Sequence, residues 1–129
     1  MKKIATTIAA FVLSAGAAFA ADPIEGMWRT VPDNNGNTGL IEVKVCGTTF
    51  CGVLTQAFDS NGAVMASDNI GKEIIFETVP HGNGRYSGKV FAPDSGKTYS
   101  SKLVLDGDNL SVSGCVLGLC RNGGTWIRQ

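Results

Sequence analysis

Four cysteines in two equally spaced pairs carry the clearest chemistry in this sequence of 129 residues. In an oxidising compartment, Cys46-x4-Cys51 and Cys115-x4-Cys120 would form a disulfide framework. Zinc is the competing interpretation, but zinc sites usually combine tighter C-x2-C knuckles or several histidines, and His81 is the only histidine. A redox-active pair would need the C-x-x-C spacing that tunes a thiol. We therefore predict structural disulfides and no metal.

Groups suited to acid–base or nucleophilic catalysis are sparse. His81 stands in the turn sequence His-Gly-Asn-Gly without a nucleophile motif beside it. Asp94 and Asp106 also occur in turns, where aspartate bonds its own backbone. The sequence contains no G-x-S-x-G, H-E-x-x-H or phosphate-loop motif. We predict that the protein is not an enzyme and uses no cofactor.

Length and charge limit the remaining classes of function. The chain is short enough for one domain, and its 11 Lys+Arg balance its 11 Asp+Glu. Charged residues make up only 17% of the chain and form no run. Because nucleic-acid binding requires a basic stripe, we expect no nucleic-acid partner.

Residues 1–20 have the build of a secretory signal peptide. Two lysines precede an uncharged apolar run over 4–19, and Ala18 and Ala20 supply the small residues that signal peptidase requires. We predict cleavage after Ala20, which leaves a mature domain of residues 21–129. An uncleaved anchor is the alternative, but a bilayer-spanning helix needs about 20 apolar residues and this run is shorter. The mature protein is expected in the periplasm or outside the cell, without a transmembrane anchor.

Short alternating runs separated by turn clusters make up the rest of the chain. Short connections make neighbouring strands antiparallel. A meander of eight such strands loses its exposed edges when it closes, so we expect an all-β, up-and-down barrel, with a two-sheet sandwich as the alternative. The expected strands are 24–30, 40–46, 50–56, 73–79, 85–91, 98–105, 110–115 and 119–128.

The same alternation places each cysteine pair on the outer face, at the two sides of a four-residue hairpin loop. Opposed hairpin cysteines are within bonding reach. This favours the pairings Cys46–Cys51 and Cys115–Cys120, while cross-pairing between the two hairpins stays open.

Two tryptophan motifs at the chain ends are similar to those of lipocalins: Gly26-Met27-Trp28 and Trp126-Ile127-Arg128. The middle of the chain resembles the bacterial domain of unknown function 2147 family, except between Phe58 and Lys72, where it departs from the family's pattern. The segments that carry this resemblance are Val43-x-Val45-Cys46-Gly47, Phe50-Cys51-Gly52, Asp94-x-Gly96-Lys97-Thr98-Tyr99 and Leu110-x-Val112-x-Gly114-Cys115.

The resemblance covers nearly the whole mature chain and implies an exported protein with a lipocalin-like barrel and no established activity. It also implies structural roles for the terminal motifs. Trp28 would pack across the closed end of the barrel near a basic residue from the far end of the chain. That residue would be Arg128, with Arg121 as its substitute, while Trp126 closes the last strand.

An eight-stranded barrel either fills with its own side chains or holds one small ligand. We predict that this barrel takes up an apolar or amphipathic small molecule. The alternative is a cell-envelope module with a packed barrel, which binds another, unknown protein. The loop over 57–72 is long enough to cap the mouth. The residues expected to line or gate the interior are Phe76, Tyr86, Tyr99, Leu103, Phe58 and Ile70.

Overall fold

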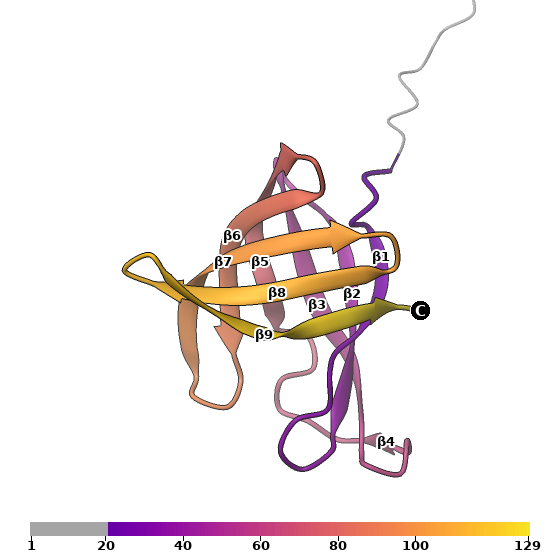
Figure 1. The fold of residues 1–129 in the computed structure, drawn as a ribbon. Helices are drawn as coiled ribbons and strands as arrows, with labels where there is room; N and C mark the ends of the chain where they lie inside the picture. The colour runs from indigo at the N-terminus through magenta and orange to yellow at the C-terminus, as the bar shows by residue number, and fades with distance from the viewer. Residues whose placement is uncertain (1–20) are drawn as a thin grey trace, which may run out of the picture.

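Eight antiparallel strands follow one another around a closed barrel wall (Figure 1). The computed structural model describes residues 21–129, and the predicted signal peptide lies outside the described residues. The sheet order is β2-β1-β9-β8-β7-β6-β5-β3, and pairing of β2 with β3 closes the barrel. The strands are β1 (Gly26–Arg29), β2 (Thr38–Cys46), β3 (Thr49–Phe58), β4 (Val64–Met65), β5 (Glu73–Gly82), β6 (Arg85–Ala92), β7 (Lys97–Asp106), β8 (Asn109–Val116) and β9 (Leu119–Arg128).

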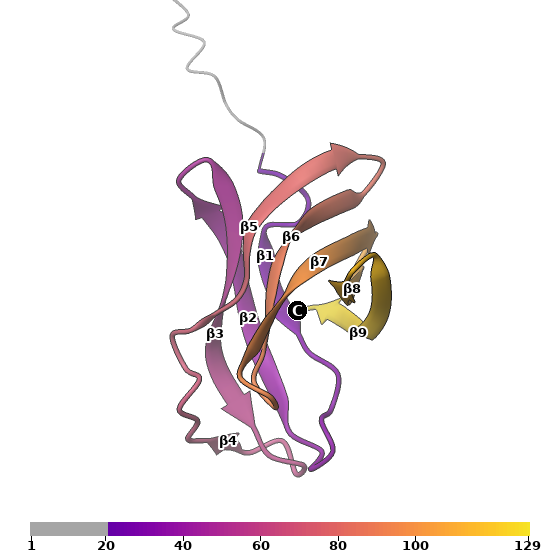
Figure 2. The ribbon, with the colours of Figure 1, turned by 90° about the vertical axis from the view of Figure 1, so that its left-hand side faces the viewer.

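The predicted up-and-down barrel is confirmed, and the sandwich alternative is wrong. Figure 2 shows β2, β3 and β5 on one side of the barrel and β7, β8 and β9 on the other. All eight expected strands are present; the last has its expected bounds, 119–128, and the other seven differ by one to three residues at one or both ends. In residues 21–129, no helix is long and apolar enough to cross a membrane.

The segment over 57–72, predicted to be an unstructured loop, contains the short strand β4. Its residues Val64 and Met65 pair with Phe58 and Ala57 of β3. The turn between β3 and β4 is held by Asp59, whose carboxylate accepts the backbone N–H groups of two residues further along, Asn61 and Ala63, at 2.9 Å each. The sequence pattern does not reveal β4, because two residues are too few to show an alternation of apolar and polar positions.

Two disulfides, Cys46–Cys51 and Cys115–Cys120, staple the β2–β3 and β8–β9 hairpins. The predicted four-residue loops are wrong, because both hairpins have two-residue turns: Cys46, the last residue of β2, pairs with Thr49, and Val116 pairs with Leu119 beyond the Cys115–Cys120 pair. These turns are 47–48 and 117–118, and Gly47 and Leu117 adopt positive φ in them. Two-residue turns of this kind match the right-handed twist of paired strands. The paired strands therefore reach closer to the end of each hairpin than the predicted four-residue loops would allow.

Removing either disulfide should destabilise the barrel. Closing a loop of about six residues reduces the entropy of the unfolded chain, which corresponds to about 2 kcal/mol. We therefore expect the paired Cys115→Ser and Cys120→Ser change to lower the free energy of unfolding by about this amount, measured by urea denaturation. An unchanged midpoint would contradict a stapling role for this disulfide.

The core fills one end of the barrel, where both chain termini of the described residues lie (Figure 1). Its members are fully buried side chains that point inward from the strands or from the segment before β1. The most completely buried apolar side chains are Trp28, Ile24, Ile41, Ile75, Leu103, Leu110 and Val43. We call this packed half the closed end.

A β-bulge in β5 changes which of its residues face inward. Gly52 of β3 pairs with Ile75, whereas the next residue, Val53, pairs with Glu73. Two consecutive residues, Ile74 and Ile75, are therefore both buried. A bulge shifts the following pleat by one residue.

Candidate functional site

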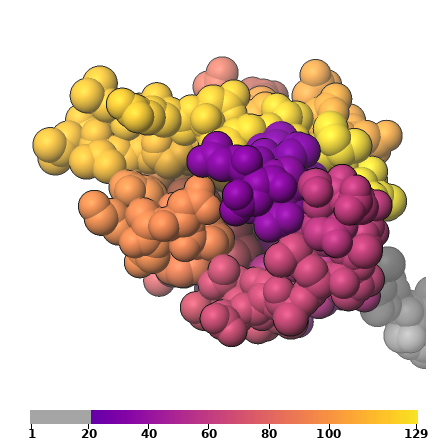
Figure 3. Space-filling view, turned by 90° about the horizontal axis from the view of Figure 1, so that it is seen from below, coloured from indigo at the N-terminus to yellow at the C-terminus, as the bar shows by residue number. Residues whose placement is uncertain are grey.

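A cavity of about 940 Å³ opens at the end of the barrel opposite the closed end. Its mouth is surrounded by four connections: β1 to β2, β3 to β5, the β6–β7 hairpin and the β8–β9 hairpin. Figure 3 looks onto this end, where the indigo, pink, orange and yellow segments surround a hollow. The barrel is thus packed at one end and hollow at the other.

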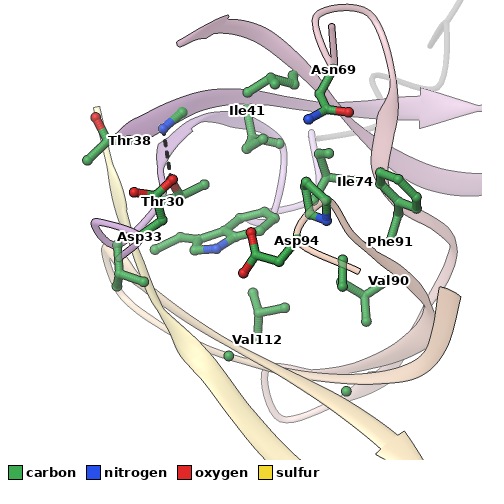
Figure 4. A pocket seen from close by; sticks show the side chains of 18 of the residues that line it. Thr30, Asp33, Thr38, Ile41, Asn69, Ile74, Val90, Phe91, Asp94 and Val112 are labelled. Carbon is green, nitrogen blue, oxygen red and sulfur yellow. Dashed lines mark hydrogen bonds between the residues drawn. The ribbon is translucent and has the colours of Figure 1, made fainter. Parts of the chain in front are cut away.

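Apolar side chains from the barrel wall form the inner surface of the cavity (Figure 4). Val90 and Phe91 of β6 line its side and are partly buried. We call the five largest buried side chains of the lining the apolar floor: Ile41, Leu54, Ile74, Val112 and Trp126. Because these side chains come from five different strands, barrel closure is what brings them together.

Polar side chains from the connections surround the mouth, and we call them the polar rim: Asn34, Asn37, Thr38, Ser67, Asn69 and Asp94. Below them, the Thr30 hydroxyl accepts the Gly39 N–H at 2.8 Å, the bond drawn in Figure 4. Asp33 is occupied by its own loop, since its carboxylate accepts two backbone N–H groups. Within residues 21–129, the side chains of Asn69 and Asp94 make no hydrogen bond, so both can bond a ligand.

Tyr99 is the predicted ligand residue that the structure places at the cavity. It faces Gly114 of the neighbouring strand β8, which also lines the cavity. A Cβ atom built on Gly114 would lie 3.5 Å from the Cβ of Tyr99, an ordinary contact distance. The glycine therefore leaves space beside the tyrosine.

Tyr86 is buried, but it lies at the closed end and does not line the cavity. Its hydroxyl donates a hydrogen bond of 2.5 Å to the carboxylate of Asp22, which precedes β1. Burial, followed by this bond and the nearby negative charge, raises the pKa of Tyr86 well above its usual value. The structure thus places the Tyr86 hydroxyl against the chain's own N-terminal segment and not at the cavity.

The raised pKa of Tyr86 makes barrel stability sensitive to alkaline pH. Above about pH 10 an unfolded tyrosine loses its proton, whereas the folded one keeps it. The folded state then binds more protons, so stability present below pH 10 is lost as pH rises, by at most about 1.4 kcal/mol per pH unit. We expect urea unfolding of Tyr86→Phe to lack this part of the pH dependence. If the free energy of unfolding of the variant depended on pH as that of the wild type does, Tyr86 would not cause the alkaline loss of stability.

The remaining four predicted ligand residues do not line the cavity either. Leu103 faces inward, but it pairs with Tyr86 and is buried in the closed end. Phe76 pairs with Lys89 and lines a separate shallow pocket with Phe91 and Thr98, because the bulge at Ile74 shifts the pleat of β5.

The predicted gating residues, Phe58 and Ile70, do not line the cavity. Phe58 lies under the guanidinium of Arg29, 4.4 Å from the ring centroid, while its strand neighbour Ala57 lines the cavity. Ile70 is 43% exposed, and the adjacent Asn69 turns toward the cavity instead. In β3, consecutive residues point to opposite faces, so Ala57 and not Phe58 lines the cavity. Asn69 and Ile70 lie in the turn before β5, where the turn itself sets their directions.

Trp28 and Arg128, the pair implied by the lipocalin resemblance, are in contact at the closed end. The Arg128 guanidinium lies 4.3 Å from the centroid of the Trp28 ring. It also donates to the backbone carbonyls of Pro23 and Glu25, which ties the last strand to the segment before β1. Arg121 instead lies at the opposite end, at the cavity.

Trp126 belongs to the cavity and not only to the end of the last strand. Trp126 pairs with Leu110, and directly paired residues of neighbouring strands lie on the same face of a sheet. Since Leu110 is on the inward face predicted for 110–115, Trp126 also points inward, where it is buried. Its height along the barrel, between the closed end and the mouth, depends on tertiary structure.

The candidate metal ligands and the histidine of the described residues lie apart from the cavity. Among residues 21–129, one trio of candidate metal ligands comes together, Cys46, Cys51 and Glu73. Its two sulfurs are joined in a disulfide and cannot act as the thiolates that zinc prefers. His81 is exposed, bonds Ser87 and does not line the cavity.

Comparison with known sequences identifies a family. The model of a family described as "Uncharacterized protein conserved in bacteria (DUF2147)" matches residues 26–128. No curated protein matches the chain significantly.

Comparison with solved structures identifies a similar fold. Protein HP1028 from the human pathogen Helicobacter pylori, described as belonging to the lipocalin family, superposes with a TM-score of 0.60. The match covers 81% of this chain and 82% of that chain at 16% sequence identity. At this identity the likeness concerns the fold, which is a lipocalin-like barrel in both proteins.

Proposed function

The chain belongs to the DUF2147 family, and we propose that it is an exported, non-enzymatic binding module for one apolar or amphipathic small molecule. The observation that carries this proposal is the cavity of about 940 Å³ above the apolar floor. Ligand pockets typically enclose about 300–1,000 Å³ and combine apolar walls with a few polar groups. This cavity has both features, which favours ligand binding over a packed barrel that acts through its outer surface alone.

The distribution of polarity orients the ligand. An apolar portion would lie against Trp126 and Val112, where burial gains about 25 cal/mol per Å² of apolar area. A polar portion would lie at the mouth, within reach of the Asn69 amide and the Asp94 carboxylate. Both of these rim groups can accept a hydrogen bond, so a hydroxyl or amine on the ligand fits them.

Export is part of the proposal. The apolar run over 4–19, the small residues at Ala18 and Ala20, and two disulfides are all typical of a protein that crosses the inner membrane. The mature domain would then begin at Ala21, directly before the Asp22 that bonds Tyr86.

Native mass spectrometry tests both parts of the proposal on protein purified from its own periplasm or medium. We expect the mass of residues 21–129 with two disulfides, together with a small adduct that solvent extraction releases. A retained leader would contradict export. A clean apo mass, combined with no uptake of an apolar naphthylamine probe, would contradict ligand binding.

A further inference from the structure

The tip of the β8–β9 hairpin exposes apolar side chains beside the cavity mouth. We define the hairpin tip as Val116, Leu117, Gly118 and Leu119. Leu117 is 98% exposed and Leu119 is 80% exposed. The tip projects beyond the rest of the barrel in Figure 1, because β9 pairs with β1 only near its other end, at Ile127 and Arg128.

The backbone conformation at Leu117 is unfavourable for a leucine. Leu117 has φ +51° and Gly118 has φ +79°, a turn conformation that favours Asn-Gly. The β5–β6 hairpin has that favoured pair, with Asn83 at φ +55° before Gly84. A leucine at positive φ that is 98% exposed buries almost no apolar surface among residues 21–129. Residues held in such a conformation cluster at functional sites.

The shape and charge of the tip indicate what covers it. A stable protein interface buries about 800 Å² on each partner, and a four-residue projection offers much less than that as a continuous face. Arg121 follows the tip, and residues 109–129 contain no Asp or Glu. Apolar side chains next to a cation fit the interfacial layer of an anionic membrane.

We propose that the hairpin tip docks the protein on an anionic phospholipid surface, with Leu117 and Leu119 inserted among the lipids. Arg121 then lies at the level of the phosphate groups. Val116, Leu117 and Leu119 also line the cavity, so an apolar ligand would pass between lipid and barrel along an apolar path. That last step rests on the proposed ligand binding, whereas docking itself does not.

Vesicle sedimentation tests the docking surface with vesicles of phosphatidylethanolamine and phosphatidylglycerol. The full chain is expressed in a bacterial host and its exported form is used. We expect the Leu117→Asn and Leu119→Thr double variant to bind at least ~10-fold more weakly, since two apolar side chains are lost from the lipid. The matched control is Val45→Thr, which changes a valine that is 57% exposed on the β2–β3 hairpin. It should bind like the wild type.

Thermal unfolding of Leu117→Asn separates docking from folding. Asparagine suits the turn, so this variant should melt at or above the wild-type temperature while it binds vesicles more weakly than the wild type. Equal binding of the double variant and the wild type would overturn the proposal, as would no binding by the wild type. A wild-type dimer that Leu117→Asn dissociates, without vesicle binding, would assign the tip to a second copy and also overturn it. Probe uptake in solution is measured separately, so failure of docking and failure of ligand binding are distinguishable.

Discussion

Replacing Trp28 with alanine should lower the free energy of unfolding by about 3–5 kcal/mol, the usual cost of a large-to-small change at a fully buried aromatic residue. The Trp28 side chain is completely buried. Its indole N–H donates to the carbonyl of Ile24 at 2.9 Å, and the Arg128 guanidinium covers its ring. The substitution thus leaves a cavity, an unpaired carbonyl and an arginine without its packing surface.

Urea denaturation checks this result, and two further measurements show where the effect originates. Ile127→Ala changes a half-exposed residue of the neighbouring strand β9, next to Arg128, and should alter the unfolding free energy by at most about 0.5 kcal/mol. Because Trp28 does not line the cavity, variant protein that is still folded should bind an apolar probe with wild-type affinity. A Trp28→Ala protein as stable as the wild type would contradict the conclusion that Trp28 stabilises the closed end.

Filling the cavity from its wall should abolish most ligand binding without harming the fold. Gly114 lines the cavity, its φ is not positive, and the nearest neighbour of a Cβ there is Tyr99 at 3.5 Å, an ordinary contact distance. A leucine side chain at this position would extend into the space beside Tyr99. We expect Gly114→Leu to weaken binding of an apolar fluorescent probe at least ~10-fold, which corresponds to about 1.4 kcal/mol.

The matched control places the same side chain on the opposite face of the same strand. Ser113 pairs with Lys102, which is exposed, so Ser113→Leu adds leucine to the outer surface and should leave probe affinity unchanged. Fluorescence titration measures affinity, and urea denaturation verifies that Gly114→Leu is at least as stable as the wild type, since glycine weakens a strand interior. Wild-type affinity in Gly114→Leu would place the binding site elsewhere.

Much of the fold was predictable because the properties that specify it are local. Alternation of apolar and polar residues identifies each strand whichever strand it pairs with, and Gly, Asn and Asp identify the turns between strands. Short connections then leave an antiparallel meander as the simplest topology. The pairings Cys46–Cys51 and Cys115–Cys120 followed as the favoured ones from the same hairpins, and both are present.

The candidate site was predicted less well, and Phe76 shows one reason. Its inward direction was inferred from an unbroken pleat, but the bulge at Ile74 and Ile75 shifts the pleat by one residue. The bulge allows Ile75 to pack closely against Gly52 and Ile41. Such an irregularity depends on contacts with another strand, so alternation within β5 cannot reveal it.

The sequence by itself determined that this chain forms eight antiparallel strands, where its turns lie and, for most of its strands, which side chains face the interior. Only the tertiary structure decided how far along the barrel axis each inward residue lies. Tyr86 and Tyr99 are equivalent by sequence pattern, yet Tyr86 bonds Asp22 at the closed end and Tyr99 lines the cavity. The reason is that height along a barrel depends on strand tilt and on the register of pairs far apart in sequence, such as Trp28 with Arg128.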